Sequence, residues 1–76
     1  MVSVSGIICP CNWDSQGNVM NVLVAADEEK DYYIEPTPLG KELNDYSGHR
    51  IYVQGILNTE DPRRTLEVQS FALSKL

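Results

Sequence analysis

The stretch that decides the fold is TPLGKELNDYSGHRIYVQGIL, Thr37 to Leu57, which predicts one short helix followed by a strand. Thr37 can cap the helix, Pro38 suits its first position, and Gly48 favours the left-handed backbone at which helices end. Apolar residues recur at helical spacing, namely Leu39, Leu43 and Tyr46. Because so short a helix is unstable alone in water, we expect its apolar stripe to pack into the open end of a β-barrel.

Runs of alternating apolar and polar residues on both sides of the helix predict five strands. Their expected ranges are Val2–Trp13, Asn18–Ala26, Asp31–Glu35, Arg50–Asn58 and Thr65–Leu73. Pro10 cannot donate to a strand ladder, so the first strand should bulge near it. A change of phase at Gln69–Ser70 predicts a second bulge in the last strand.

The same alternation predicts which side chains face the core. On the third strand, Tyr32 and Ile34 are expected inside and Tyr33 outside. On the fourth strand, Tyr52 is expected to point away from the core. The core face of the second strand is expected to carry Met20, Val22, Val24 and Ala26.

Two of the predicted strands carry a glycine in a matching context. VSGII at Val4 to Ile8 has the same pattern as VQGIL at Val53 to Leu57. A glycine inside a strand marks a sharp bend or a close backbone approach. Strands that coil enough to belong to both halves of a small barrel need such a bend, so we expect Gly6 and Gly55 at its corners.

Three strands, a helix and two strands, with these two glycines, resemble the OB-fold, a five-stranded Greek-key barrel. The patterns GxI…WDxxG, at Gly6 to Gly17, and GxxVxVxG, at Gly48 to Gly55, are similar to those of small single-domain bacterial OB-fold proteins, mostly of unassigned function. The resemblance covers Val4 to Leu73. It implies a mostly β fold, with one short helix between strands three and four, and a single domain over residues 1–76. It also implies a binding face on strands two and three, but no reaction.

Size and charge narrow the class of protein further. The chain has 76 residues and a net charge of −5, from six basic and eleven acidic residues. This balance disfavours a nonspecific grip on nucleic acid, although it leaves room for a small basic patch. No apolar run approaches the roughly 20 residues that cross a bilayer, and the N-terminus lacks the pattern of a secretion signal. We therefore expect a cytoplasmic protein without a membrane partner.

Cys9-Pro10-Cys11 is the one motif that suggests metal chemistry. Residues two apart on a strand share a face, so both thiols could chelate a soft metal or form a strained disulfide. Zinc prefers four ligands, however, and the single histidine, His49, lies far away in sequence. We expect reduced thiols that pack as small apolar groups, with no metal and no other cofactor. His49 has no matching nucleophile or acid in sequence, so we expect no enzyme activity.

Aromatic and arginine side chains are the candidate binding residues: Trp13, Tyr32, Tyr33, Tyr52, Arg63 and Arg64. We expect a non-catalytic OB-type binding or adaptor module that meets a protein or a small ligand through strands two and three. The alternative is single-stranded nucleic-acid binding through that face and the loop between strands four and five, with Arg50 assisting. A site built on Cys9 and Cys11 is a third hypothesis. The opposite interpretation is that Trp13 and one tyrosine belong to the core or the barrel rim. The oligomeric state is left open.

Overall fold

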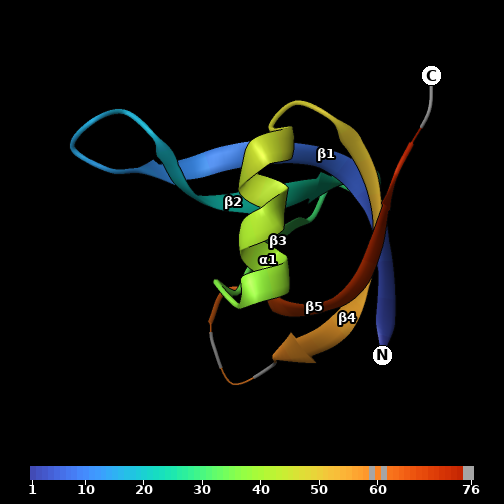
Figure 1. Ribbon diagram of the computed structural model, residues 1–76. Coiled ribbons are helices and arrows are strands. Elements are labelled where there is room, and N and C mark those ends of the chain that lie inside the picture. Colours follow the sequence, from blue (N-terminus) through green and yellow to red (C-terminus); the bar gives the residue numbers. More distant parts are fainter. Residues whose placement is uncertain (59, 61, 75–76) are drawn as a thin grey trace.

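The protein is represented by a computed structural model that describes residues 1–58, 60 and 62–74. Its elements in chain order are β1 (Val2–Trp13), β2 (Val19–Ala26), β3 (Asp31–Ile34), α1 (Pro38–Glu42), the 3₁₀ helix η1 (Leu43–Tyr46), β4 (Arg50–Asn58) and β5 (Thr65–Leu73). The strands form a closed barrel in the order β1-β2-β3-β5-β4 (Figure 1). The prediction of a mostly β, five-stranded barrel with one short helix between the third and fourth strands is confirmed.

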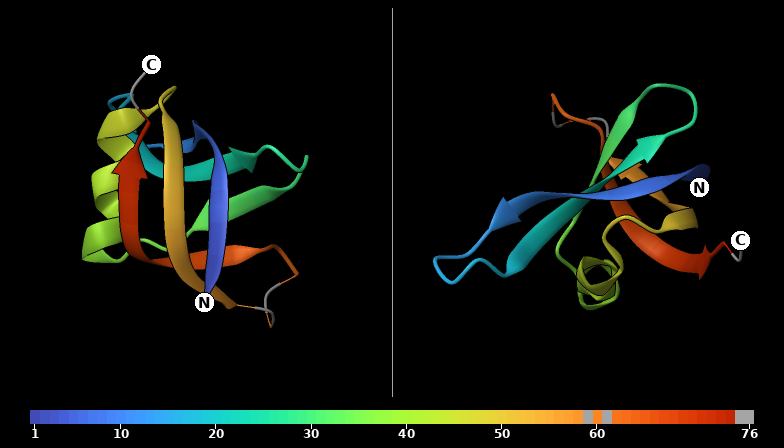
Figure 2. Two further views of the ribbon diagram at one scale, coloured as in Figure 1. Left: turned by 90° about the vertical axis from the view of Figure 1, so that its right-hand side faces the viewer. Right: turned by 90° about the horizontal axis from the view of Figure 1, so that it is seen from above.

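β1 is the strand that joins the two halves of the barrel. It pairs with β2 from Gly6 to Trp13 and with β4 from Val2 to Ile7, in both cases antiparallel. β3 and β5 close the barrel through the one parallel pairing among the described strands. Figure 2 shows β1, β4 and β5 side by side, with β2 and β3 behind them. The outer faces of β3 and β4 therefore belong to different sides of the molecule.

The two strand glycines allow this sharp coiling, as the sequence predicted. A Cβ added at Gly6 would collide with the carbonyl oxygen of Ala25 on β2. A Cβ added at Gly55 would collide with the carbonyl oxygen of Glu67 on β5. At both positions only hydrogen fits between two backbones, which is the close approach expected of a glycine inside a strand.

The helix closes one end of the barrel and completes the core (Figure 1). Thr37 caps it, since its side-chain oxygen accepts a 3.0 Å hydrogen bond from the Gly40 N–H. Leu43 is fully buried, and Leu39 and Tyr46 pack against the core from the same stripe. The remaining core side chains come from all five strands: Val4, Ile8, Val22, Val24, Ala26, Tyr32, Ile34, Ile51, Val53, Leu66 and Val68. Within the described residues, no helix has the length and apolar character that a membrane crossing requires.

Both predicted bulges are present. Pro10 pairs with Val22 and Asn12 with Asn21, which leaves Cys11 as the additional residue on β1. On β5, Gln69 is the additional residue, because Gln54 pairs with Ser70 and Gly55 with Val68.

One predicted core position is wrong. Met20 is 48% exposed, although Val22, Val24 and Ala26 on the same strand are buried as expected. The register shifts again beyond Asn12, where Trp13 pairs with Val19, so Met20 is an additional residue on β2. This second irregularity changes the phase of the strand, and Val19 packs against the core in place of Met20. β2 and β3 are also each one residue shorter than predicted, beginning at Val19 and ending at Ile34.

Candidate functional site

The outer face of β3 is centred on Tyr33. Tyr32 and Ile34 are buried on the inner face, and Tyr33 is half-buried on the outer one, as the alternation predicted. Its neighbours across the sheet are Leu23 on β2 and Thr65 on β5. Tyr33 thus lies in the middle of a three-strand surface.

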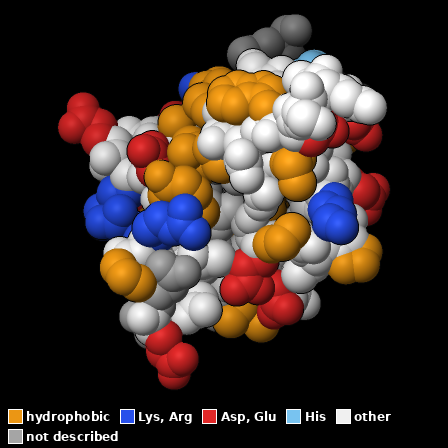
Figure 3. Space-filling view, turned by 90° about the vertical axis from the view of Figure 1, so that its left-hand side faces the viewer, with side chains coloured by type: hydrophobic (Ala, Val, Ile, Leu, Met, Phe, Trp, Pro, Cys, Tyr) orange, Lys and Arg blue, Asp and Glu red, His pale blue; other side chains and the backbone are white. Residues whose placement is uncertain are grey.

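The loop between β4 and β5 folds over this tyrosine. The guanidinium carbon of Arg63 lies 4.6 Å from the centroid of the Tyr33 ring, in a cation–π contact. The Tyr33 N–H donates a 2.7 Å hydrogen bond to the carbonyl oxygen of Arg64, which holds the loop at the edge of β3. Figure 3, which views the barrel from the side of the β1–β2 hairpin, shows basic side chains lying next to apolar ones on this face.

A groove of about 420 Å³ runs between the β3 face, the bulged end of β1 and this loop. Tyr33, Val22 and Cys11 contribute apolar surface to its lining. The polar part of the lining comes from Asn12, Asn21, Glu35, Arg63 and Thr65. Its size falls within the range of small-ligand sites, and its mixture of ring, amide and charged groups can fix the orientation of a bound chain.

Cys11 faces this groove because it is the bulge residue of β1. Burial raises the pKa of its thiol, while the nearby Arg63 charge acts in the opposite direction. A raised pKa favours the uncharged thiol, so Cys11 contributes an uncharged, apolar wall to the groove.

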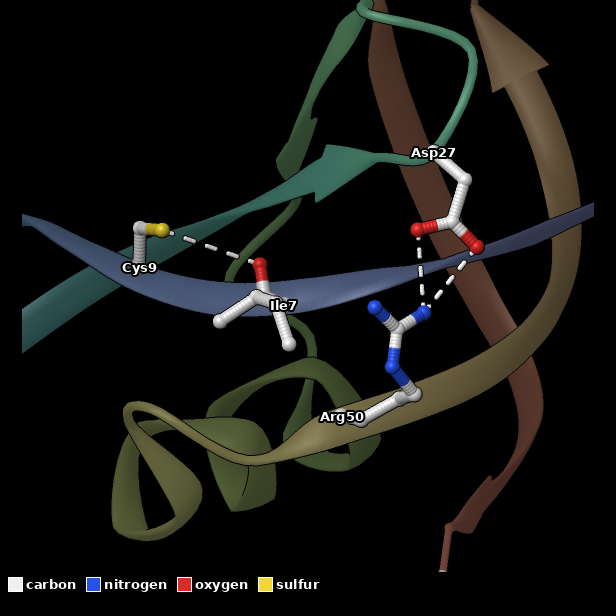
Figure 4. Close-up of polar contacts among 4 residues, drawn as sticks. All are labelled: Ile7, Cys9, Asp27 and Arg50. Carbon is white, nitrogen blue, oxygen red and sulfur yellow. Dashed lines mark hydrogen bonds and ion pairs between the residues drawn. The ribbon is translucent and has the colours of Figure 1, made fainter.

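The Cys9 side chain makes a contact within its own strand. Its Sγ lies 3.7 Å from the carbonyl oxygen of Ile7, on its own strand (Figure 4). Both cysteines are free thiols. No cluster of three or more His, Cys, Asp or Glu side chains suited to a metal ion occurs among residues 1–58, 60 and 62–74.

The structure brings only part of the predicted binding set together. Tyr33 and Arg63 meet in the groove, whereas the Arg64 side chain is exposed and is not part of the lining; only its backbone carbonyl bonds Tyr33. Trp13, at the end of β1, is 52% exposed and therefore not a core residue. Tyr52, 46% exposed, lines a separate recess on the β4 side together with Ser5 and Ala72.

Tyr32 is a correction to the predicted set. It is 8% exposed, so its ring is part of the core and has no free face for stacking. Its hydroxyl donates a 2.8 Å hydrogen bond to Glu28. This hydrogen bond, and secondarily burial, raise the pKa of the phenol.

Arg50 also lies outside the groove. Its guanidinium donates hydrogen bonds of 2.9 and 3.0 Å to the two carboxylate oxygens of Asp27 (Figure 4). This ion pair connects β4 to the turn after β2, across β1. Arg50 lies beside the exposed Tyr52, with which it lines the recess on the β4 side, so Arg50 and Arg63 border different tyrosines.

Sequence reasoning missed the polar groove residues Asn12, Asn21, Glu35 and Thr65. One of them carried a usable signal, because Asn21 interrupts an otherwise apolar second strand. Glu35 carried another, since it lies two residues after Tyr33 and so falls on the same face. Asn12 and Thr65 gave no such signal, since their position depends on the bulge and on the parallel pairing.

Comparisons of the chain with family models, with curated proteins and with solved structures give no significant match. The candidate site therefore rests on the geometry described above.

Proposed function

We propose that this protein is a non-catalytic, OB-type binding module that takes a segment of a partner protein, or a small ligand, in the groove on the outer face of β3. The observation that carries the proposal is the outward-facing Tyr33, half-buried beneath Arg63 in a groove of about 420 Å³. An aromatic ring set among amide and charged groups is a typical anchor for a peptide or a small molecule.

The strand order and the position of the helix support the comparison with OB-type barrels. In that architecture, ligands meet the β2–β3 face and the adjoining loops. Here the same face carries the groove, and the β4–β5 loop supplies one of its walls.

A peptide selection tests this proposal and uses Tyr52 as a matched control. A random peptide library displayed on phage is selected on the wild-type protein, and enriched peptides are then measured on Tyr33→Ala and Tyr52→Ala variants. Both tyrosines lie on outer strand faces, so each variant removes a comparable ring. We expect Tyr33→Ala to weaken binding by roughly tenfold or more and Tyr52→Ala to leave it unchanged. Peptides that depend on Tyr52 instead, or on neither ring, would contradict the proposal.

Single-stranded nucleic acid is a second candidate ligand, favoured by the exposed Trp13 and by Arg63 and Arg64 near Tyr33. Bases stack on such rings, and arginines neutralise phosphates. The net charge of −5 opposes it. Fluorescence anisotropy with labelled oligothymidylate and oligouridylate at low salt decides between them. Binding that weakens steeply with added salt and is lost in Arg63→Ala would favour nucleic acid.

A further inference from the structure

The outer face of β3 presents an aromatic ring between two carboxylates. Asp31, Tyr33 and Glu35 lie two residues apart, so their side chains leave the same face of the strand. The alternation continues past the end of β3, because the Glu35 N–H still pairs with the carbonyl oxygen of Leu66, at 3.0 Å. Asp31 is exposed, and Glu35 lines the groove.

The chain already places a cation of its own on this surface. Arg63 lies over the Tyr33 ring, which is itself flanked in sequence by the two acids. A guanidinium over an aromatic face gains from the negative quadrupole of the ring, and nearby carboxylates add to that attraction. The internal contact thus indicates which chemical group this surface favours.

A second recess extends the acidic surface beyond Glu35. It measures about 360 Å³ and shares Glu35 with the groove. Glu60 and Glu67 line it, together with Ile56, which is half-exposed. The groove and this recess, which meet at Glu35 and are together called the track, offer a ring, an aliphatic side chain and carboxylates, on a protein of net charge −5. Charge complementarity therefore favours a cationic occupant.

We propose that this track binds a basic, extended segment of a partner protein, and that an arginine or lysine of the partner replaces Arg63 on the Tyr33 ring. The inference rests on the proposed function and specifies the chemistry of its ligand. Arg63 then acts as an internal competitor, which keeps the ring covered in the absence of the partner. Glu35 pairs with the incoming cation, and Glu60 and Glu67 with the basic residue that follows it.

Three labelled peptides of equal length provide the test. The first alternates arginine with serine, the second replaces each arginine by citrulline, and the third replaces it by glutamate. Citrulline retains the planar shape of arginine without its charge. Fluorescence anisotropy is expected to show binding of the arginine peptide, at least roughly tenfold weaker binding of the citrulline peptide, and no binding of the glutamate peptide. Added salt should weaken the arginine complex.

Variants locate the binding site and test the competition. Tyr33→Leu and Glu35→Gln should each weaken binding of the arginine peptide. Tyr33→Phe keeps the ring and should retain binding. Arg63→Ala should raise the affinity for the arginine peptide several-fold, because the competing internal cation is removed. Tyr52→Leu, which removes the ring of the separate β4 recess, is the matched control and should leave the affinity unchanged. Circular dichroism of each variant confirms that the barrel is retained.

Each opposite result overturns the inference. Equal binding of the arginine and citrulline peptides would exclude recognition of the charge, and no binding of the arginine peptide would exclude a basic ligand. If Arg63→Ala binds the arginine peptide more weakly and the wild-type protein binds oligothymidylate, the outer face of β3 is instead a site for single-stranded nucleic acid. If the phage selection yields Tyr33-dependent peptides that are neutral or acidic, this inference fails while the proposed function stands. If it yields no Tyr33-dependent peptide, both fail.

Discussion

The outer faces of β3 and β4 each present a tyrosine, and they differ in what surrounds it. Tyr33 is half-buried, lies under Arg63 and lines a groove that the β4–β5 loop helps to enclose. Tyr52 is the more exposed of the two, at 46%, and its neighbours across the strands are the small residues Ser5 and Ala72. Exposure of an aromatic ring is therefore a poor guide to a site here. A better guide is whether a charged loop residue covers the ring, as Arg63 of the β4–β5 loop covers Tyr33.

The contrast follows from the path of the chain. β3 is short, and the segment leading into β5 passes close beside it in parallel orientation, which brings the loop residue Arg63 onto the ring. β4 is long and pairs along most of its length with both neighbours, so the residues beside Tyr52 across the sheet are strand residues of β1 and β5. Four predictions test this contrast, from the largest expected effect to the smallest.

Substituting Gly6 should abolish the contrast by preventing barrel closure. In Gly6→Val the new side chain would meet the backbone of Ala25, and backbone cannot move aside cheaply. We expect a loss of about 3 kcal/mol or more in the free energy of unfolding, measured by urea denaturation. Ser5→Val, at the exposed neighbouring position, is the control and should change stability by no more than about 0.5 kcal/mol. Equal effects of the two substitutions would show that the close approach at Gly6 does not matter.

The two adjacent tyrosines of β3 should respond differently to loss of a hydroxyl. Tyr32→Phe removes the hydrogen bond to Glu28 and should cost about 1 kcal/mol, whereas Tyr33→Phe should cost less than about 0.5 kcal/mol. The pKa of Tyr32 is raised in the folded state, first by Glu28 and then by burial. The contribution of the Tyr32 hydroxyl to the free energy of unfolding is therefore complete below the unfolded pKa of about 10. It is lost as the pH rises through the pKa of the folded state.

Urea midpoints measured across that alkaline range should show this difference. The wild-type protein and Tyr33→Phe should lose stability together, and the advantage of both over Tyr32→Phe should shrink. A constant advantage at every pH would contradict the role assigned to the Tyr32 hydroxyl.

Removing the cation from the Tyr33 face should have a modest effect on stability. Arg63→Ala deletes the contact with the Tyr33 ring and should cost about 0.5 to 1 kcal/mol at low salt. Arg64→Ala, which keeps the backbone carbonyl that bonds Tyr33, is the matched control and should have almost no effect. Urea denaturation of the two variants measures the difference. The same stability in both would mean that Arg63 does not hold the loop on β3.

The smallest effect is expected at the β1–β2 hairpin, whose loop extends away from the barrel (Figure 1). The Asp14 carboxylate accepts 2.9 Å hydrogen bonds from the N–H groups of Asn18 and Gln16, and these bonds, that of Asn18 foremost, lower its pKa. These hydrogen bonds order the hairpin loop at a pH above the unfolded pKa of about 4. The ordering is lost as the pH falls through the lower pKa of the folded state.

Amide chemical shifts of Gln16 and Asn18, followed during acidification, report this titration. Asp14→Asn keeps an accepting oxygen without a charge and should remove the pH dependence. A titration of the same amides that persists in Asp14→Asn would assign the change to another carboxylate.

Local pattern predicted most of the architecture. Alternation placed Tyr32 inside and Tyr33 outside, the cap at Thr37 marked the helix start, and Gly6 and Gly55 marked two close approaches between the backbones of neighbouring strands. Met20 escaped prediction because a bulge changes the phase of a strand, and the bulge results from pairing with another strand. The groove residues Asn12 and Thr65 were missed for the same kind of reason.

The sequence by itself determined the number and order of the elements and the inner and outer residues of most strands, because these follow from contacts between near neighbours along the chain. Only the tertiary structure decided that Arg63 covers Tyr33, that Cys11 and Glu35 share its groove, and that Tyr52 and Arg50 belong elsewhere. Those relations join residues of different elements, so they are set by barrel closure and by the packing of a loop.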